Sequence, residues 1–383
     1  MNNNCYEPII LVPRSDIETG PDYDKCHIHN CGLCNQLFSL VNGIIKGYNR
    51  GCNVFVVDSF GFCVEKGTIC RASEIFNYEL MSEKMSNILG REIYFIDRTD
   101  IKLRVLSAKY GLYGVKTVDV TDILSNKIGH NVLKFQGNLN DIFGVDPLPN
   151  VVKNLYIEYD IGNKIIKESF PEQCVNIDYD TKSIDDMFRT EKSSWAWYNR
   201  YNVTLFNELC QCITFHPKLV KIVDLIRDEL NMNAENYDVV HLRVEDDALD
   251  WWHKINHLDK DIFKHKLFEK YRGIINEYCG NNICLLTNAT SDINELFPQA
   301  TFTYIPKEKK EKLSAEILGF KGREINAIID LMIGSDCKGI FVGCHNYHLS
   351  RGSTLSYILG LKQHKYKIMI DLDNIIADEI ILI

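Results

Sequence analysis

The sequence of 383 residues predicts an α/β protein built from two open sheets. Short apolar segments such as VVHLRV, NICLLTN and GIFVG are separated by helical segments, a pattern typical of a parallel, doubly wound sheet. Residues 323–336 repeat isoleucine and methionine at helical spacing, which predicts an amphipathic helix. The chain is longer than is usual for a domain with a single hydrophobic core, so we expect two domains.

The second half alternates strands and helices with few interruptions. We expect strands at 237–244, 282–288, 301–306, 339–343 and 366–372, and helices at 219–230, 259–278, 291–297, 323–336 and 353–363. The charged run KEKKEK at 307–312 is interpreted as a solvated loop. A domain boundary near residue 215 would divide the chain into 1–215 and 216–383.

The first half begins with the same alternation and then loses it. PIILVP reads as a strand, NQLFSLVNGIIKGY as a helix and NVFVVDSF as the next strand. Residues 90–215 are less regular, and within them 154–170 alternate like a hairpin inserted into the domain. Two such Rossmann-like domains would face each other across a cleft, where open sheets bind ligands at the carboxyl ends of their strands.

Composition excludes several classes of function. The net charge of −9 argues against broad binding to a nucleic-acid backbone. We expect no membrane span, because no apolar run approaches the roughly 20 residues that one needs. The start has no signal-peptide pattern, so we expect a cytoplasmic protein whose 14 cysteines are reduced. The segment CHIHNCGLC leaves a zinc module as an alternative, although no second C-x-x-C follows.

The first candidate site is the strand end VVHLRVEDD. Two apolar residues, at positions 239 and 240, are followed by the ionisable residues His241, Arg243, Glu245 and Asp246. Charged groups at a strand end must be solvated by water, paired with a group of opposite charge, or part of a functional site. The planar guanidinium of Arg243 suits a phosphate or diphosphate, and the alternative is that it pairs with Glu245 or Asp246 and holds the loop.

Three further segments carry candidate residues. In RGSTLSYIL, Ser353 and Thr354 would present hydroxyls and amides to an anion beside Arg351, or would only cap a helix. In GLCNQLF, Gly32 and Asn35 lie at the first strand-to-helix turn, where asparagine is commonly a cap.

Asp330 lies within the apolar stripe of 323–336, where an unpartnered acid is costly. It would accept hydrogen bonds from a base edge or from a donor within the protein. The sequence leaves both interpretations open.

These motifs resemble, in the same order, those of fucosyltransferase-type inverting glycosyltransferases. GLCNQLF is similar to their G-x-x-NQ loop, HLRVEDD to their H-x-R strand end in its plant-like version, and RGSTLSYIL to the start of their last motif helix. The resemblance implies two Rossmann-like domains facing a cleft, the GT-B architecture. It implies that the protein transfers L-fucose from GDP-fucose to a hydroxyl of a glycan or protein, without a metal or another cofactor.

The resemblance also implies roles for single residues. His241 and Arg243 would contact the donor diphosphate, with Arg243 at the phosphate that leaves. Ser353 and Thr354 would add bonds to the same phosphates. Asp330 would read the guanine edge.

Asn35, in the resemblance, would lie near the reacting sugar. Glu245 and Asp246 are the nearest candidates for a base at the acceptor hydroxyl, with Glu245 preferred. Two alternatives remain at this stage: an enzyme that uses UDP-L-rhamnose, and a carbohydrate- or nucleotide-sugar-binding protein without catalysis.

Overall fold

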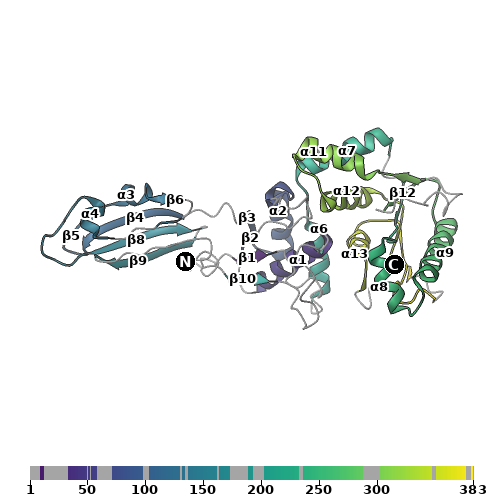
Figure 1. The fold of residues 1–383 in the computed structure, drawn as a ribbon, viewed down its shortest axis with the longest axis horizontal. Coiled ribbons are helices and arrows are strands. Elements are labelled where there is room, and N and C mark those ends of the chain that lie inside the picture. Colours follow the sequence, from purple (N-terminus) through teal and green to yellow (C-terminus); the bar gives the residue numbers. More distant parts are fainter. Residues whose placement is uncertain are drawn as a thin grey trace.

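We describe the protein from a computed structural model (Figure 1). The residues that the structure describes are 9–12, 33–49, 51, 53–57, 71–97, 103–129, 132–133, 137–161, 164–172, 189–192, 202–232, 236–287, 302–346, 351–376 and 381–382.

The C-terminal half contains the predicted parallel sheet. Its strands, in spatial order, are β13 (Phe302–Tyr304), β12 (Ile283–Leu286), β11 (Asp238–His241), β14 (Ile340–Gly343), β17 (Tyr366–Met369) and the antiparallel edge strand β18 (Ile381–Leu382). Consecutive residues Val239 and Val240 of β11 are both fully buried. Burial on both faces explains why the central strands β11, β12 and β14 contain consecutive apolar residues.

The strand order reverses direction at β11. The chain runs from β11 to β12 and β13 on one side, then crosses over so that β14 pairs with the other side of β11. The carboxyl ends of β11 and β14 therefore flank the point where open α/β sheets bind their ligands. This edge contains the strand end that the sequence singled out.

Helices cover both faces of this sheet. They are α7 (Pro217–Leu230), α8 (Asp246–Ile255), α9 (Lys260–Tyr278), α11 (Lys307–Leu318), α12 (Arg323–Asp336) and α13 (Thr354–Gly360). The predicted stripe on α12 is confirmed, because Ile325, Ile328, Ile329 and Ile333 are fully buried. The run 307–312 is a correction to the sequence-based expectation: it opens helix α11 and is not a loop.

The N-terminal half contains a second parallel sheet. Its order is β10 (Arg189–Lys192), β1 (Ile9–Val12), β2 (Val54–Val57) and β3 (Tyr94–Asp97). Helices α1 (Leu33–Asn49), α2 (Tyr78–Leu89) and α6 (Val203–Cys212) belong to this half, with the short 3-10 helix η3 (Ala72–Glu74) before α2. The α/β class is confirmed, whereas two Rossmann-like domains about a cleft stay a prediction.

A separate β lobe interrupts the N-terminal sheet between β3 and β10 (Figure 1). Its antiparallel sheet has the order β5 (Lys116–Asp119), β4 (Leu103–Leu112), β8 (Asn154–Ile161) and β9 (Lys164–Pro171). The other elements of the lobe are α3 (Thr121–Ser125), α4 (Leu139–Phe143) and the two-residue strands β6 (Ile128–Gly129) and β7 (Val132–Leu133). It has its own buried core, and its β8–β9 pair confirms the predicted inserted hairpin.

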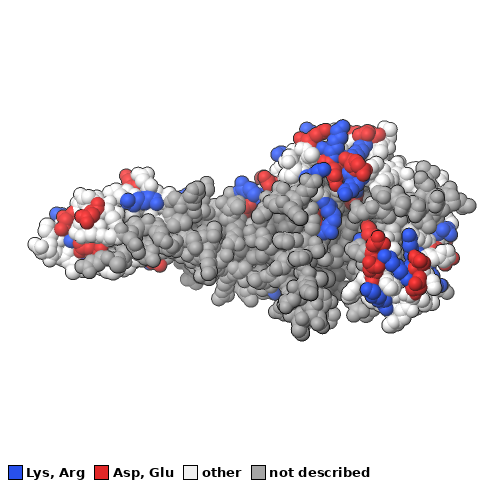
Figure 2. Space-filling model, viewed as in Figure 1, with Lys and Arg blue, Asp and Glu red and all other residues white. Residues whose placement is uncertain are grey.

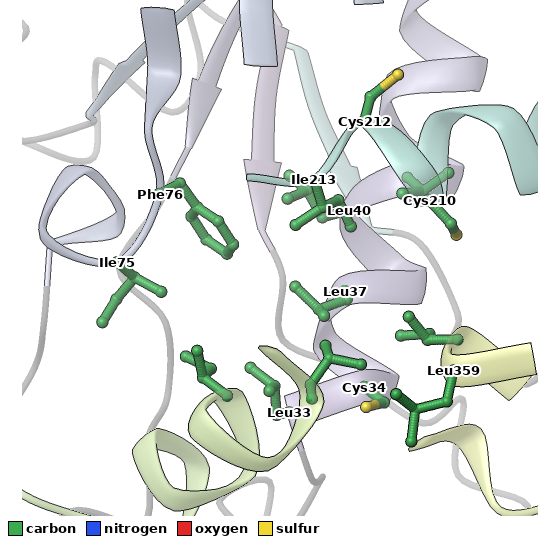
Figure 3. Packing of buried hydrophobic residues seen from close by; sticks show 14 of the residues in the cluster. Leu33, Cys34, Leu37, Leu40, Ile75, Phe76, Cys210, Cys212, Ile213 and Leu359 are labelled. Atoms are coloured by element: carbon green, nitrogen blue, oxygen red, sulfur yellow. The ribbon is translucent and has the colours of Figure 1, made fainter. Parts of the chain in front are cut away.

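One apolar core joins the helices of the two halves. Phe38 of α1 packs edge-on against Tyr357 of α13, with ring centroids 5.5 Å apart, and against Phe206 of α6 at 5.3 Å. The Tyr357 hydroxyl also donates to Oδ1 of Asn207 at 2.6 Å. Figure 3 shows Leu359 of the C-terminal half beside Cys34 at the start of α1. The predicted boundary near 215 falls between α6 and α7, within this shared core.

Charge on the surface is mixed in sign. On the face drawn in Figure 2, lysine and arginine alternate with aspartate and glutamate over α7 and α11, and again around α8 and α9. None of the helices that the structure describes has the length and apolar character needed to cross a membrane.

Candidate functional site

The end of β11 is joined to α13 by a buried hydrogen-bonded histidine. His241 Nδ1 lies 2.7 Å from Oγ of Ser356, and that oxygen accepts the backbone N–H of Cys344, just after β14, at 3.0 Å. Burial, with the nearby charge of Arg243 adding to it, lowers the pKa of His241 to about 3. The imidazole is therefore neutral at physiological pH.

A tyrosine that sequence analysis missed fixes the backbone at this strand end. Tyr271 extends from α9, and its hydroxyl donates to the carbonyl oxygen of His241 at 2.8 Å. The same hydroxyl accepts the N–H of Arg243 at 3.4 Å. Burial raises the pKa of Tyr271 well above its ordinary value, so the hydroxyl stays protonated. Because Tyr271 is fully buried in an apolar helix stripe, its sequence context resembles that of an ordinary core aromatic.

Arg243 forms an ion pair in the loop after β11. Its Nη1 donates to Oε2 of Glu245 at 2.6 Å, and the two side chains are 26% and 19% exposed. Glu245 precedes α8 at the capping position but makes no capping hydrogen bond, because its carboxylate is turned to Arg243. The pairing that sequence analysis weighed as an alternative is therefore present. The pair remains within reach of solvent.

Asp246 points elsewhere. Its carboxylate is 90% exposed and lies 3.0 Å from Nζ of Lys260, which also contacts Asp250 at 2.8 Å. The structure therefore separates Glu245 and Asp246, which the sequence placed together as candidate bases. Of these two carboxylates, the one that pairs with Arg243 is that of Glu245.

Ser353 occupies the capping position of α13. Its Oγ accepts the backbone N–H of Ser356 at 3.4 Å, and the side chain is buried. Thr354 is partly exposed and begins the helix. The capping interpretation is thus confirmed for Ser353. The contacts of Ser353 and Thr354 with donor phosphates stay predictions.

A small hairpin carries Arg351. The strands β15 (His345–Asn346) and β16 (Arg351–Gly352) pair antiparallel just before α13, and the side chain of Arg351 lies outside what the structure describes. Gly352 has a φ of +123°, and a Cβ there would lie 2.7 Å from Cα of His345. Only glycine allows this close approach of the two strands.

Asp330 is held by a buried lysine. Both of its carboxylate oxygens lie 2.8 Å from Nζ of Lys310, and these side chains are only 9% and 3% exposed. Burial raises the pKa of Asp330, while Lys310 acts against that rise. Lys310 belongs to the run 307–312, so the expectation of a wholly solvated run is wrong at this residue. The donor within the protein that sequence analysis weighed for Asp330 is present, and reading of a base edge stays a prediction.

Asn35 belongs to the first turns of α1, which contacts α12 and α13 of the other half. Its Oδ1 is buried and has no hydrogen-bond partner among the residues that the structure describes. Gly32 lies outside those residues, as does most of CHIHNCGLC. The described cysteines Cys34, Cys210, Cys212, Cys279, Cys284, Cys337 and Cys344 are free thiols. Within the described ranges, no group of three or more His, Cys, Asp or Glu side chains is arranged to hold a metal ion.

No protein-family model and no curated protein matches the sequence. Among solved structures, the chain is similar to NodZ α-1,6-fucosyltransferase soaked with GDP-fucose, at 12% identity and TM-score 0.47 over 99% of both chains. It is similar to fucosyltransferase NodZ from Bradyrhizobium, at 12% identity and TM-score 0.48 over 99% of this chain and 98% of that one. It is also similar to POFUT1 in complex with GDP-fucose, at 10% identity and TM-score 0.46 over 96% and 99%.

Proposed function

We propose that the protein is an inverting, metal-independent glycosyltransferase that moves L-fucose from GDP-fucose to a hydroxyl of a glycan or protein. The observation that carries this proposal is the position of Arg243. It follows β11 at the point where the strand order reverses, it is partly exposed, and its guanidinium is paired with the carboxylate of Glu245. That is where an open α/β sheet binds a nucleotide.

The diphosphate would bind by competing with Glu245 for Arg243. A guanidinium carries five N–H donors in a planar fork, which suits two phosphate oxygens better than one carboxylate oxygen. As the bond to the sugar breaks, negative charge builds on the diphosphate, and a fixed cation at that place lowers the barrier. Loss of one such donor typically costs about 10²–10³ in rate. Arg243 would supply this charge without a metal ion.

The neutral His241 would orient the donor without adding charge. We propose the tautomer in which Ser356 donates to Nδ1 and the ring proton is on Nε2, which would then donate a hydrogen bond to a phosphate oxygen. Tyr271 holds the backbone on both sides of Leu242, at the carbonyl of His241 and the N–H of Arg243, so the geometry is set before the donor arrives. Ser353, Thr354 and Arg351 are proposed as further phosphate contacts, and Gly32 and Asp330 as further donor-binding residues.

Glu245 is the base that we propose for the acceptor hydroxyl. When the diphosphate takes Arg243, the carboxylate of Glu245 loses its partner and becomes available for the proton. The exposure of Asp246 and its pairing with Lys260 make it the weaker candidate. Asn35 would bring a buried acceptor oxygen, unpaired within the described part of the chain, from the N-terminal half, which we assign to the acceptor side.

Thermal unfolding with excess GDP, UDP or no nucleotide tests the proposal. GDP at about 100 times its dissociation constant should stabilise the wild-type protein by roughly 2.7 kcal/mol. Arg243→Ala should abolish this stabilisation, whereas Arg272→Ala, an exposed arginine on α9, should retain it. Stabilisation by UDP alone would favour the rhamnose-transferring alternative. Stabilisation by neither nucleotide would contradict the donor site.

Transfer of radiolabelled fucose to acceptor glycans and proteins, with EDTA present, then tests the reaction itself. Binding of GDP without any transfer would favour the non-catalytic alternative. Activity that EDTA abolishes and Mg²⁺ restores would contradict the metal-independent mechanism.

A further inference from the structure

A cavity of about 530 Å³ lies on the helix layer between the two halves, away from the strand-end residues described above. Its walls come from α1, α2 and α6 on one side and from α7, α12 and α13 on the other. Figure 3 shows Leu37, Ile213 and Cys210, which line it, on the side of α1 and α6. The volume is within the range of roughly 300–1,000 Å³ that is typical of small-molecule sites.

Most of the wall is apolar. Leu80, Phe215, Val220, Leu331, Met332 and Ile358 line it together with Leu37 and Ile213. Apolar surface of this extent gains free energy when a ligand removes it from water. The body of a fitting ligand is therefore hydrocarbon.

The polar side chains of the wall mostly have partners within the protein. Asn77 accepts the N–H of Leu80 and so caps α2, and Ser335 donates to the carbonyl of Leu331. Asp336 pairs with Arg227, which also lies 3.8 Å from Asp224. The carboxylates of the cavity are thus engaged with a cation that does not line it.

The two lysines of the wall differ from these groups. Neither Lys221 nor Lys362 makes a side-chain hydrogen bond or ion pair within the part of the chain that the structure describes. Lys221 is exposed at the rim, whereas Lys362 is partly buried. Burial lowers the pKa of Lys362, the charge of Lys84 acts in the same direction, and Cys210, Cys212 and Asp336 oppose the shift. An anion beside Lys362 would offset the cost of burying its ammonium group.

We propose that this cavity binds a free amphipathic carboxylate, with its alkyl chain against the apolar wall and its head group on Lys362. Lys221 adds positive charge at the rim. The ligand would contact both halves at once. Leu331 follows Asp330 directly, and Ile358 lies two residues after Ser356, so an occupied cavity would also hold α12 and α13 in place behind the strand end. The inference does not depend on the proposed function.

Calorimetric titration of the full chain tests the proposal, with decanoate, decanol and decyltrimethylammonium as probes below their micelle concentrations. We expect decanoate to bind best and the cationic amphiphile worst. Lys362→Met should weaken decanoate by about tenfold or more and leave decanol unchanged. Lys338→Met, which changes an exposed lysine outside the cavity, should leave both affinities unchanged.

A second variant guards against loss of folding at position 362. Val220→Trp places a large side chain at the partly exposed mouth of the cavity and should weaken decanoate and decanol together. Equal binding of the three amphiphiles would overturn the proposal, as would decanoate binding that neither variant alters, or no binding by the wild-type protein. GDP stabilisation, measured in parallel, reports separately on the strand-end site.

Discussion

Two ion pairs of the C-terminal half differ in how far water reaches them. Arg243 and Glu245 follow β11 in a loop, and about a quarter and a fifth of their side chains are exposed. Lys310 and Asp330 join α11 to α12 and are almost completely buried. Each pair contains one carboxylate and one cation. Only the first can exchange its partner at little cost.

This difference in burial distinguishes Arg243, which a ligand can reach, from Lys310, which has a structural role. A buried pair is expensive to break, because the remaining charge stays in an apolar surrounding. A partly exposed pair is weaker, since water and salt screen it. The same chemistry therefore stabilises the helix layer in one place and leaves an arginine within reach of a ligand in the other.

The largest expected effect comes from the buried pair. Lys310→Met leaves the buried carboxyl group of Asp330 without its partner, and should lower the free energy of unfolding by about 3–5 kcal/mol. Denaturant unfolding measures this loss. Lys312→Met, in the same charged run but exposed, is the control and should change stability by less than about 0.5 kcal/mol. Equal effects of the two variants would contradict a structural role for Lys310.

The double variant Lys310→Met, Asp330→Leu should recover most of that loss, because apolar residues of similar size replace buried pairs without penalty. Since it should fold, it also tests whether Asp330 reads the guanine base. If the double variant folds but GDP no longer stabilises it, that result would favour guanine recognition by Asp330. Retention would leave Asp330 with its structural role.

The next effect comes from the hydroxyl that links β11, β14 and α13. Ser356→Ala removes the partner of His241 Nδ1 and of the N–H of Cys344, and both groups are buried. Leaving buried polar groups unpaired should cost up to about 3 kcal/mol. Ser335→Ala removes only a bond to the preceding helical turn and should be nearly neutral in urea unfolding. A neutral Ser356→Ala would show that the link does not stabilise the strand end.

The third effect is on the dependence of stability on pH. The pKa of His241 is lowered to about 3, so above pH 6.5 the group is neutral in both the folded and the unfolded chain. As the pH falls, the unfolded chain takes up a proton that the folded one refuses. His241 should therefore lower stability by roughly 2 kcal/mol between pH 7 and pH 5.

Unfolding of the wild-type protein and of His241→Gln at a series of pH values measures this effect. The variant should lose less stability over the interval than the wild type does. Identical losses would contradict a buried neutral histidine at the end of β11.

The sequence predicts the C-terminal strands, α12 and the position of Arg243, but it does not predict the buried pair of Lys310 and Asp330. The strands of the C-terminal sheet were identified because residues such as Val239 and Val240 are buried on both faces, and α12 because its isoleucines repeat at helical spacing. The position of Arg243 followed from the strand end itself. Lys310 was missed because a lysine within a charged run has no local sign of burial, and its partner is 20 residues away in the chain.

The short helices of the inserted lobe and the buried hydroxyl groups of Tyr271 and Ser356 also leave little trace in the sequence pattern. Helices α3 and α4 of the inserted lobe have five residues each, too few to show a helical period. Tyr271 and Ser356 lie among apolar helix residues, where a hydroxyl differs little in pattern from a core side chain. Their roles become visible only when α9 and α13 are packed on the sheet.

The smallest expected effect distinguishes the neighbours Glu245 and Asp246. Asp246→Asn removes one of two carboxylates on Lys260, both exposed, and should lower stability only slightly in low salt and not measurably in high salt. Because Asp246 points away from Arg243, GDP stabilisation should match that of the wild type. Glu245→Gln should instead slow transfer while GDP still binds, since Arg243 is retained. If Asp246→Asn removed GDP stabilisation, the nucleotide would lie over α8 and α9, and Arg243 would belong to the loop alone.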